Sequence, residues 1–192
     1  MKIAVIGGIG CGKSEVMLAF ERAGYLTLSA DKINADLWED EAYIDTLKAN
    51  FPEAVVDDTI TRQSLGGVVF GNPEKLEKLN SIAHPLIVGK IKEAQGDNVA
   101  VELPLAIESG ILDTFDKVIM VDTKMRIRLK RLEGRGLTRK RAREIMSVQV
   151  PIRKLKKRAN IIITNNGTMD ELSAKAETVA ISLKNNYTKV YV

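Results

Sequence analysis

One segment decides the fold of this chain: Gly7-Gly8-Ile9-Gly10-Cys11-Gly12-Lys13-Ser14. It fits G-x-x-x-x-G-K-[ST], the pattern of a loop whose backbone N–H groups surround the phosphates of a nucleotide. The apolar run 2–6 precedes it and has the length of a buried parallel strand. After it, apolar residues from Val16 to Ala23 recur at helical spacing until Gly24 provides a stop. Strand, loop and helix in this order predict a nucleoside triphosphate site rather than a flexible glycine turn.

The parts of this loop have separate predicted roles. Its glycines let N–H groups turn toward a polyphosphate at the positive end of the following helix. Lys13 is expected to reach the β- and γ-phosphates, and the Ser14 hydroxyl to ligate Mg²⁺. A thiol near a helix N-terminus can also be acidified and open to modification, which is an expectation for Cys11. The residues of this stretch expected to contact the nucleotide are Gly8, Gly10, Cys11, Gly12, Lys13, Ser14 and Glu15.

Length and composition describe one globular domain with room for an insertion. The 192 residues are 45% hydrophobic and 28% charged. The first apolar run is too short for a secretory signal, and no run approaches about 18 apolar residues, so we expect a cytoplasmic protein without a membrane partner. Cys11 is the only cysteine, which excludes an internal disulfide and fits a reducing compartment. The oligomeric state stays open, as monomer or small homo-oligomer.

Positive charge is concentrated in one segment. Residues 124–158 hold 15 Lys and Arg against 2 Asp and Glu, a net charge of +13 in a chain whose total is +4. The segment could be a phosphate-clamping lid, a nucleic-acid surface or a solvated helix face. Aromatic residues make up only 5% of the chain and do not interleave with these charges, which disfavours single-strand binding by base stacking.

Strands and helices alternate along the chain, which predicts an α/β fold around a parallel sheet. Further strands are expected at 25–29, 99–103, 117–122 and 160–164, with no buried strand between 32 and 97. Helices are expected at 32–38, 40–50, 73–80, 84–95 and 168–184. Polar residues follow the later strands, and the carboxyl ends of parallel strands form the edge where ligands bind. The members of this expected edge are Asp31, Glu102, Asp122 and Asn165.

Several side chains each allow two interpretations. Asp31 could orient an attacking hydroxyl and accept its proton, or cap the helix that follows. Glu102 could hold the water shell of Mg²⁺, or be an ordinary turn carboxylate. His84, the only histidine, stands before Pro85 at an expected helix start, and such a histidine is more often structural than in contact with substrate.

The stretch Arg131-Leu132-Glu133-Gly134-Arg135 resembles the lid entry of adenylate kinase-like enzymes. Two arginines four residues apart are expected to share a helix face, where one guanidinium stacks on adenine and the other contacts phosphate. Thr138 is expected to cap a basic helix that follows, and a mobile lid of this kind excludes water from the transferring phosphoryl group. The alternative is a solvated helix face.

The helical insertion after the second strand is too long for a simple crossover, and phosphotransfer kinases place acceptor-binding helices there. The N-K-x-D motif with which GTPases read guanine is absent. Further motifs then make the chain recognisable, and together they resemble the dephospho-CoA kinase family over about residues 1–172. They are Gly7–Ser14, Ala30-Asp31-x-Ile33, Arg62-x-x-Leu65 with Val69-Phe70, Ala83-His84-Pro85-Leu86-Ile87, Leu103-Pro104-Leu105-x-x-Glu108, Val121-Asp122, Arg131-Leu132-x-x-Arg135, Gln149 and Asn165-x-Gly167.

The resemblance implies a P-loop kinase, a three-layer α/β sandwich with a five-stranded parallel sheet of order 2-3-1-4-5. It implies a single domain over 1–192, with a helical CoA subdomain at about 33–97 and a lid at about 134–150. The family transfers the γ-phosphoryl group of ATP, with Mg²⁺, to the 3′-hydroxyl of dephospho-CoA; another P-loop kinase acting on a nucleotide or small-molecule hydroxyl is the alternative.

The resemblance also implies residue roles. Asp31 is the expected catalytic carboxylate, assisted by Lys13 and Arg135. Arg131, Arg135 and Asn165 join the loop residues on the nucleotide, and Ser14 and Glu102 are expected at the metal. The expected acceptor side is Asp31, Arg62, His84, Pro104 and Glu108.

The chain departs from the family pattern at four positions. Ser29 and Asn160 stand where the family usually has Asp, Arg128 where it has Gln, and Ala106 where it has Leu. The change at Ser29 is the nearest to the chemistry. It puts in doubt a second carboxylate beside Asp31 and leaves Asp31 itself matched.

Overall fold

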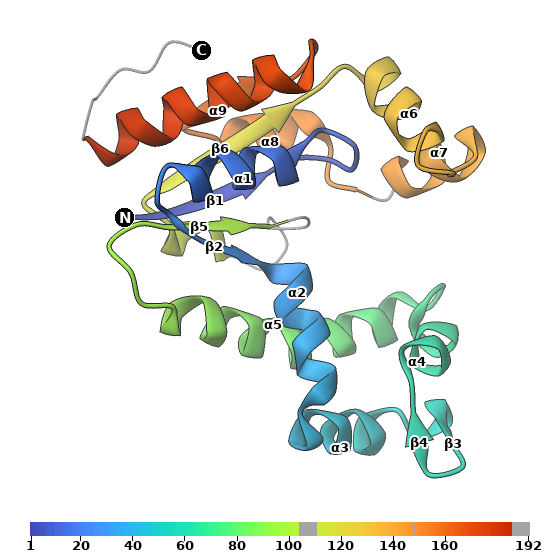
Figure 1. Cartoon of the computed structure of the whole chain (residues 1–192). Helices are drawn as coiled ribbons and strands as arrows, with labels where there is room; N and C mark the ends of the chain where they lie inside the picture. The colour runs from blue at the N-terminus through green and yellow to red at the C-terminus, as the bar shows by residue number, and fades with distance from the viewer. Residues whose placement is uncertain (104–110, 148, 186–192) are drawn as a thin grey trace. The chain divides into compact units, whose positions relative to one another are not determined.

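The structure is a computed structural model that describes residues 1–103, 111–147 and 149–185 (Figure 1). It divides into two compact units. The first comprises Met1–Ala30 and Ala94–Val192, and the second comprises Asp31–Glu93. Compactness says nothing about binding, so a single domain with an acceptor-binding insertion at 33–97 and a lid at 134–150 stays a prediction.

The first unit is built on the predicted five-stranded parallel sheet (Figure 1). The strand order β2-β5-β1-β6-β7 is the predicted 2-3-1-4-5, because β5, β6 and β7 are the third, fourth and fifth strands expected from the sequence. The parallel pairing and the continuous apolar runs of β1 and β6 are typical of a sheet covered on both faces. The strands are β1 Lys2–Ile6, β2 Leu26–Ser29, β5 Val99–Glu102, β6 Lys117–Asp122 and β7 Ile161–Thr164.

Helices cover both faces of this sheet, which confirms the three-layer prediction. On one face α1 (Lys13–Arg22) and α9 (Met169–Lys184) pack over Ile3 and Val5 of β1. On the other face α8 (Ile152–Arg158) packs against β6, where Met120 is buried. Successive residues of a strand point to opposite faces, so a strand buried on both faces must be apolar throughout.

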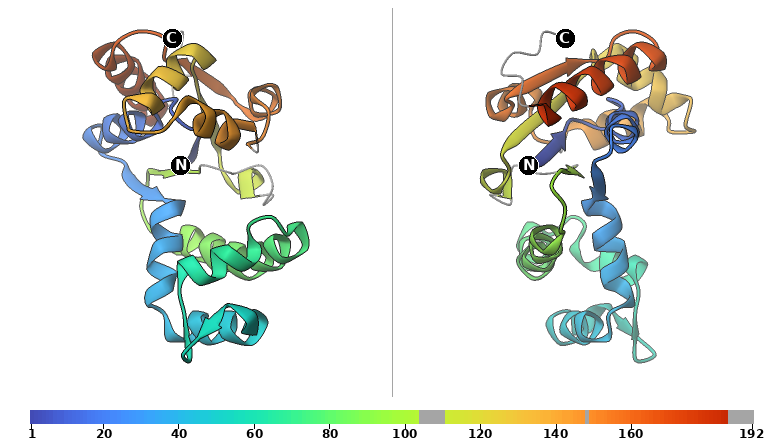
Figure 2. Two further views of the ribbon diagram at one scale, coloured as in Figure 1. Left: turned by 90° about the vertical axis from the view of Figure 1, so that its right-hand side faces the viewer. Right: turned by 60° about the vertical axis from the view of Figure 1, so that its left-hand side comes forward.

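Two helices of the first unit, α6 (Met125–Glu133) and α7 (Arg139–Ser147), lie against each other (Figure 2). Leu132 and Ala142 join them in a small core. The predicted cap of α7 is confirmed, since the Arg141 N–H donates to Thr138 Oγ1 at 3.2 Å. The expectation that Arg131 and Arg135 share a helix is wrong, because α6 ends at Glu133 and Gly134 follows as its cap.

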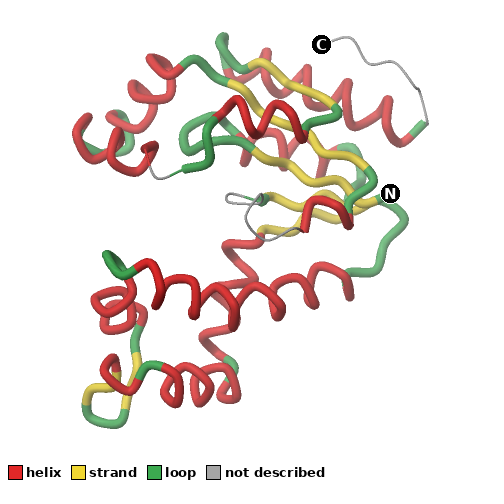
Figure 3. The backbone as a smooth tube through the Cα atoms, turned by 180° about the vertical axis from the view of Figure 1, so that it is seen from behind, coloured by secondary structure: helices red, strands yellow, loops and turns green. Residues whose placement is uncertain are grey.

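The second unit is mostly helical, with one small hairpin (Figure 3). Its helices pack on a core of their own around Leu47, Phe51 and Leu65. Asp40 caps α3 (Glu41–Asn50), because its carboxylate accepts a hydrogen bond from the Ala42 N–H at 2.9 Å. The elements are α2 Ala30–Asp36, η1 Leu37–Glu39, α3 Glu41–Asn50, η2 Pro52–Ala54, β3 Val55–Val56, β4 Thr59–Ile60, α4 Arg62–Val69 and α5 Pro73–Glu93.

Two elements of this unit were not predicted from the sequence, and one predicted helix start is wrong. The helix α4 and the hairpin β3–β4 were not predicted; the hairpin turns through Asp57 and Asp58, which both have positive φ. Helix α5 is continuous, so His84-Pro85 does not begin a helix. A proline inside a helix removes one backbone hydrogen bond, at a cost of about 3 kcal/mol. Apolar residues on both sides of Pro85 pack on the same core, and this burial offsets the loss; they are Leu79, Ile82, Ala83 and Ile87.

The remaining described element is the 3-10 turn η3 (Ile111–Thr114) in the first unit. Among the helices in the described part of the chain, none has the length and apolar character needed to cross a membrane.

Candidate active site

The loop between β1 and α1 leaves the start of α1 open to a ligand. No side chain caps the helix, and Gly12 at its N-cap has the left-handed φ of 99°. The first N–H groups of a helix have no partner within it, so an uncapped start presents them to an anion. Space also requires glycine at this position, because a Cβ on Gly12 would lie 2.5 Å from Asn165 Nδ2.

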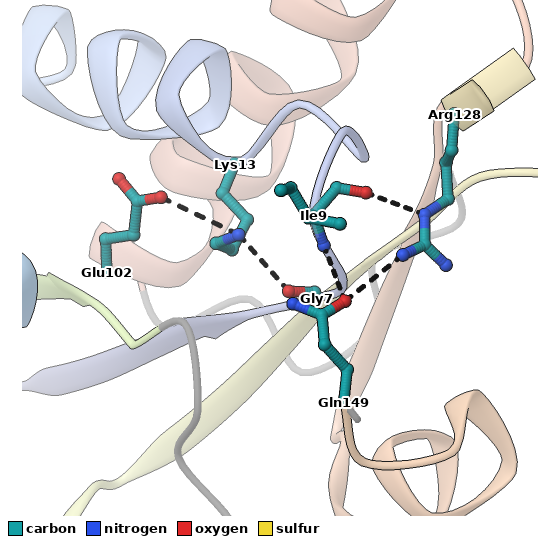
Figure 4. Close-up of polar contacts among 6 residues, drawn as sticks. All are labelled: Gly7, Ile9, Lys13, Glu102, Arg128 and Gln149. Carbon is teal, nitrogen blue, oxygen red and sulfur yellow. Dashed lines mark hydrogen bonds and ion pairs between the residues drawn. The ribbon is translucent and has the colours of Figure 1, made fainter. Parts of the chain in front are cut away.

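Lys13 and Glu102 lie together at the end of the sheet (Figure 4). Lys13 is only 9% exposed; its Nζ donates to the Gly7 carbonyl at 3.2 Å and lies 3.8 Å from Glu102 Oε1. Glu102 is the last residue of β5, and β5 pairs directly with β1. Parallel pairing therefore brings two of the predicted site residues into one cluster, although they are far apart in the sequence.

Two buried side chains, Asn165 and Thr123, are hydrogen-bonded to the backbone of the phosphate loop. Asn165 Nδ2 donates to the Cys11 carbonyl at 2.8 Å, and Thr123 Oγ1 donates to the same oxygen at 3.0 Å. Asn165 was expected on the nucleotide; the hydrogen bond of its amide nitrogen to the loop backbone does not test that contact. Sequence reasoning missed Thr123, and the only signal was a hydroxyl directly after the polar end of the fourth predicted strand.

Arg131 is bonded on one side and unpaired on the other. Its Nη2 donates to Asn165 Oδ1 at 3.0 Å. Its Nη1 is the one buried side-chain polar atom in the described residues with no hydrogen-bond partner. Leaving such an atom without a hydrogen bond costs about 1–3 kcal/mol, which a ligand that accepts a hydrogen bond from it would recover.

A hollow of about 750 Å³ lies beside Arg131. Its volume is in the range of sites for small ligands and cofactors. Arg135 does not line it and is exposed beyond the end of α6. The lining residues are Arg126, Ile127, Lys130, Arg131, Glu133, Arg139, Asn166 and Gly167.

The Cys11 thiol was expected to be acidified and open to modification, and the structure does not support this. It is 1% exposed, and burial raises its pKa above the ordinary value. Nearby Lys13 lowers the pKa by a smaller amount. An acidified, modifiable thiol is therefore wrong for the folded protein, because desolvation exceeds the effect of the neighbouring cation.

Two further residues hold the tip of the loop (Figure 4). Arg128 Nε donates to the Ile9 carbonyl at 2.8 Å, and the Ile9 N–H donates to Gln149 Oε1 at 3.0 Å. Arg128 Nη2 and Gln149 Oε1 are 3.3 Å apart and form a third hydrogen bond. The sequence marked Arg128 only as a departure from the family pattern and quoted Gln149 only as part of that pattern.

Two carboxylates near the predicted edge have partners of their own. Asp122 Oδ2 is paired with Lys156 Nζ at 2.7 Å, which attaches α8 to the end of β6. Glu15 is in the first turn of α1, where its Oε1 lies 3.7 Å from Arg22 Nη2. Neither pairing tests the predicted contact of Glu15 with the nucleotide.

The expected acceptor-side residues that are described lie in the second unit. Asp31 is exposed in the first turn of α2. Since α2 begins at Ala30, Asp31 is not the residue that precedes the helix, and no hydrogen bond to its carboxylate is found among the described residues. Arg62 donates to the Ala35 carbonyl at 2.8 Å and lies over the Trp38 ring at 5.6 Å, while His84 is half-buried on α5. Pro104 and Glu108 lie outside the described residues.

The sheet, the open loop and its buried lysine define the class of protein: a P-loop phosphotransferase. A family model for dephospho-CoA kinase matches residues 1–171. The dephospho-CoA kinase of Fusobacterium nucleatum is 34% identical over 184 residues, which cover 92% of this chain and 95% of that protein.

Solved structures agree with this match. The dephospho-CoA kinase from Campylobacter jejuni is 30% identical with a TM-score of 0.71, over 97% of this chain and 100% of that one. A Thermus thermophilus structure has a TM-score of 0.81 at 28% identity, over 98% of each chain. The chain belongs to the dephospho-CoA kinase family.

Proposed function

We propose that this protein transfers the γ-phosphoryl group of ATP to the 3′-hydroxyl of dephospho-CoA, the last step of coenzyme A synthesis. The family match over residues 1–171 supports the activity. The observation that carries the assignment of residues is the phosphate loop, with its uncapped helix start and its buried Lys13. We also assign the protein to the cytoplasm, where ATP is present and its one thiol stays reduced.

On the nucleotide side, Lys13 binds the β- and γ-phosphates together with the N–H groups at the start of α1. The base of ATP occupies the hollow beside Arg131, where a planar guanidinium suits stacking on adenine and the unpaired Nη1 supplies a donor. Arg135, exposed between α6 and α7, contacts the transferring phosphoryl group, and the basic segment 134–150 acts as the lid.

The residues at the loop also fit Mg²⁺, which prefers oxygen ligands and keeps several waters. Ser14 is exposed in the first turn of α1, and Glu102 is the carboxylate beside Lys13. No group of three or more His, Cys, Asp or Glu that could hold a metal occurs in the part of the chain that is described, so substrate phosphates and water would supply the remaining ligands. Ser14 would bind the ion directly and Glu102 through its water shell. An ion held there would supply positive charge that neutralises the phosphates of ATP.

On the acceptor side, Asp31 orients the 3′-hydroxyl and accepts its proton. The hydroxyl oxygen then forms a bond to the γ-phosphorus as the bond to the β–γ bridging oxygen breaks, and ADP leaves. Lys13 and Arg135 stabilise the negative charge that develops on the phosphoryl oxygens. Arg62, His84, Pro104 and Glu108 bind the rest of dephospho-CoA.

A coupled assay of ADP release tests this proposal. Dephospho-CoA should raise ADP release at least tenfold above the rate with ATP alone, while AMP, CMP and shikimate should not. Faster release with one of these three would favour the alternative, a P-loop kinase with another acceptor hydroxyl.

A further inference from the structure

At the tip of the phosphate loop, both backbone groups of Ile9 are hydrogen-bonded to side chains from elsewhere in the chain. The Ile9 N–H donates to Gln149 and the Ile9 carbonyl accepts from Arg128 (Figure 4). The two holding side chains also bond to each other, so the three residues form a closed ring of hydrogen bonds. Arg128 comes from α6 and Gln149 from the segment that follows α7. Two elements outside the loop therefore fix the conformation of its tip.

Arg128 is a buried cation that holds the loop without a carboxylate among its described hydrogen-bond partners. It is 5% exposed, and both of its described hydrogen-bond acceptors are neutral oxygens. No carboxylate of the described residues lies within 4.0 Å of it, since the nearby Asp122 is paired with Lys156 instead. Desolvation lowers the pKa of Arg128, because removing a charge from water disfavours the charged form. A polyphosphate at the loop would compensate the charge.

The position of Arg128 also explains Gly8. A Cβ at Gly8 would lie 2.3 Å from Arg128 Nη2, so the guanidinium packs directly on the loop backbone. Four glycines make this loop flexible in the absence of such contacts, and an unrestrained loop would lose that freedom each time a nucleotide binds. Contacts that fix the loop beforehand remove this entropic cost from the binding step.

We propose that Arg128 and Gln149 are positioning residues that hold the Ile9 peptide, so that the phosphate loop is ready for the nucleotide before it binds. Through Gln149 they link the loop to the segment after α7. The inference rests on the proposed function only in taking the loop's ligand to be a nucleoside polyphosphate. It does not depend on the identity of the acceptor.

Calorimetric titration with Mg·ADP, without any acceptor, tests the proposal. Arg128→Met should raise the Kd for ADP about tenfold or more, and Gln149→Leu about fivefold to tenfold. Arg128→Lys keeps the charge but lacks the fork that bonds to both Ile9 and Gln149, so its Kd should be intermediate. In steady-state assays KM for ATP should rise in parallel, while KM for dephospho-CoA stays within twofold of wild type.

Two further variants complete the test. The double variant Arg128→Met/Gln149→Leu should bind ADP within threefold of the weaker single variant, because both side chains hold the same peptide. Arg153→Met removes an exposed cation from α8, outside the proposed lid at 134–150, and should leave the Kd for ADP within twofold of wild type.

Three results would overturn the proposal. They are an unchanged Kd for ADP in Arg128→Lys and Gln149→Leu, an equal rise of both KM values with a lower melting temperature, and fully multiplicative effects in the double variant. If instead the proposed function is wrong, dephospho-CoA is not phosphorylated although the ADP titrations behave as stated, so the two failures are distinguishable.

Discussion

The two units of this protein treat their candidate functional residues differently. In the first unit Lys13, Asn165 and Arg128 are at most 9% exposed, and each is hydrogen-bonded to the backbone of the phosphate loop. In the second unit Asp31 and Arg62 are exposed, and the described contacts of Arg62 are one carbonyl and one ring. These three nucleotide-side groups are therefore held by the loop backbone, whereas Asp31 and Arg62 are accessible to solvent.

This difference has a physical consequence for substitutions. A buried side chain that satisfies other polar groups contributes to folding as well as to function, since its removal leaves those groups unpaired. An exposed side chain with few partners contributes little to stability and can be tested for function alone.

The largest effect on activity is expected from an exposed acceptor-side residue of the second unit. Asp31→Asn keeps size and shape but removes the charge that would orient the acceptor and receive its proton. The kcat should fall by about 10²–10⁴, the usual contribution of a general base, with an unchanged melting temperature. Binding of Mg·ATP and of dephospho-CoA should stay within a few-fold. Full activity in this variant would remove the base from the mechanism.

The substitution Lys13→Ala tests the buried nucleotide side in the first unit. Its Nζ would meet charge that grows in the transition state, and loss of one such donor costs about 10²–10³ in rate. Circular dichroism and thermal unfolding should show that the fold persists. A variant with turnover within threefold of wild type would mean that this loop is not the catalytic one.

Arg131 and Arg135 offer a comparison inside the first unit, because one is held by Asn165 and the other is exposed. Arg131→Ala should mainly raise KM for ATP, by about tenfold, since the proposed stacking on adenine is a binding interaction. Arg135→Ala should mainly lower kcat, because its proposed partner is the moving phosphoryl group. Equal effects on KM alone in both variants would contradict the lid assignment.

The smallest effect concerns stability, and each unit contains its own probe. Cys11 is the only cysteine and lies in the first unit; Trp38 is the only tryptophan and lies in the second. Asn165→Ala removes one of the two donors to the Cys11 carbonyl and the acceptor of Arg131 Nη2, so the free energy of unfolding of the first unit should fall by about 1–3 kcal/mol. Thiol modification of Cys11 should then be faster, with an unchanged urea midpoint of Trp38 fluorescence.

Arg62→Ala is the matched variant of the second unit. It removes one hydrogen bond and one cation–π contact of an exposed side chain, worth about 0.5–1 kcal/mol. The midpoint of Trp38 fluorescence should shift slightly, and Cys11 reactivity should not change. If Arg62→Ala proved more destabilising than Asn165→Ala, the contrast between the two units would be wrong.

Much of the first unit could be predicted because its signals are local. The loop pattern, the apolar strands and the cap at Thr138 each depend on a few consecutive residues, and parallel βαβ connections restrict the ways in which strands can be ordered. The resemblance to a known family supplied the strand order, which the structure confirms. Both Lys13 and Glu102 were expected at the site, and their proximity follows from the pairing of β1 with β5.

The missed features depend on contacts between distant segments or on competing local signals. The roles of Arg128 and Thr123 appear only when α6 and the end of β6 lie against the loop. Pro85 predicted a helix start, but burial on both sides of it kept α5 continuous. The hairpin at 55–60 has two Val, a Thr and an Ile around an Asp-Asp turn, and this signal could have been recognised.

Identification of the product tests the central claim most directly. The purified protein would be incubated with γ-labelled ATP, Mg²⁺ and dephospho-CoA, and the products separated and compared with authentic coenzyme A. The account predicts one ADP for each coenzyme A formed, with the labelled phosphate attached to the 3′-oxygen, and no coenzyme A with the Lys13→Ala variant. Formation of ADP without labelled coenzyme A, or label at another hydroxyl of the acceptor, would contradict it.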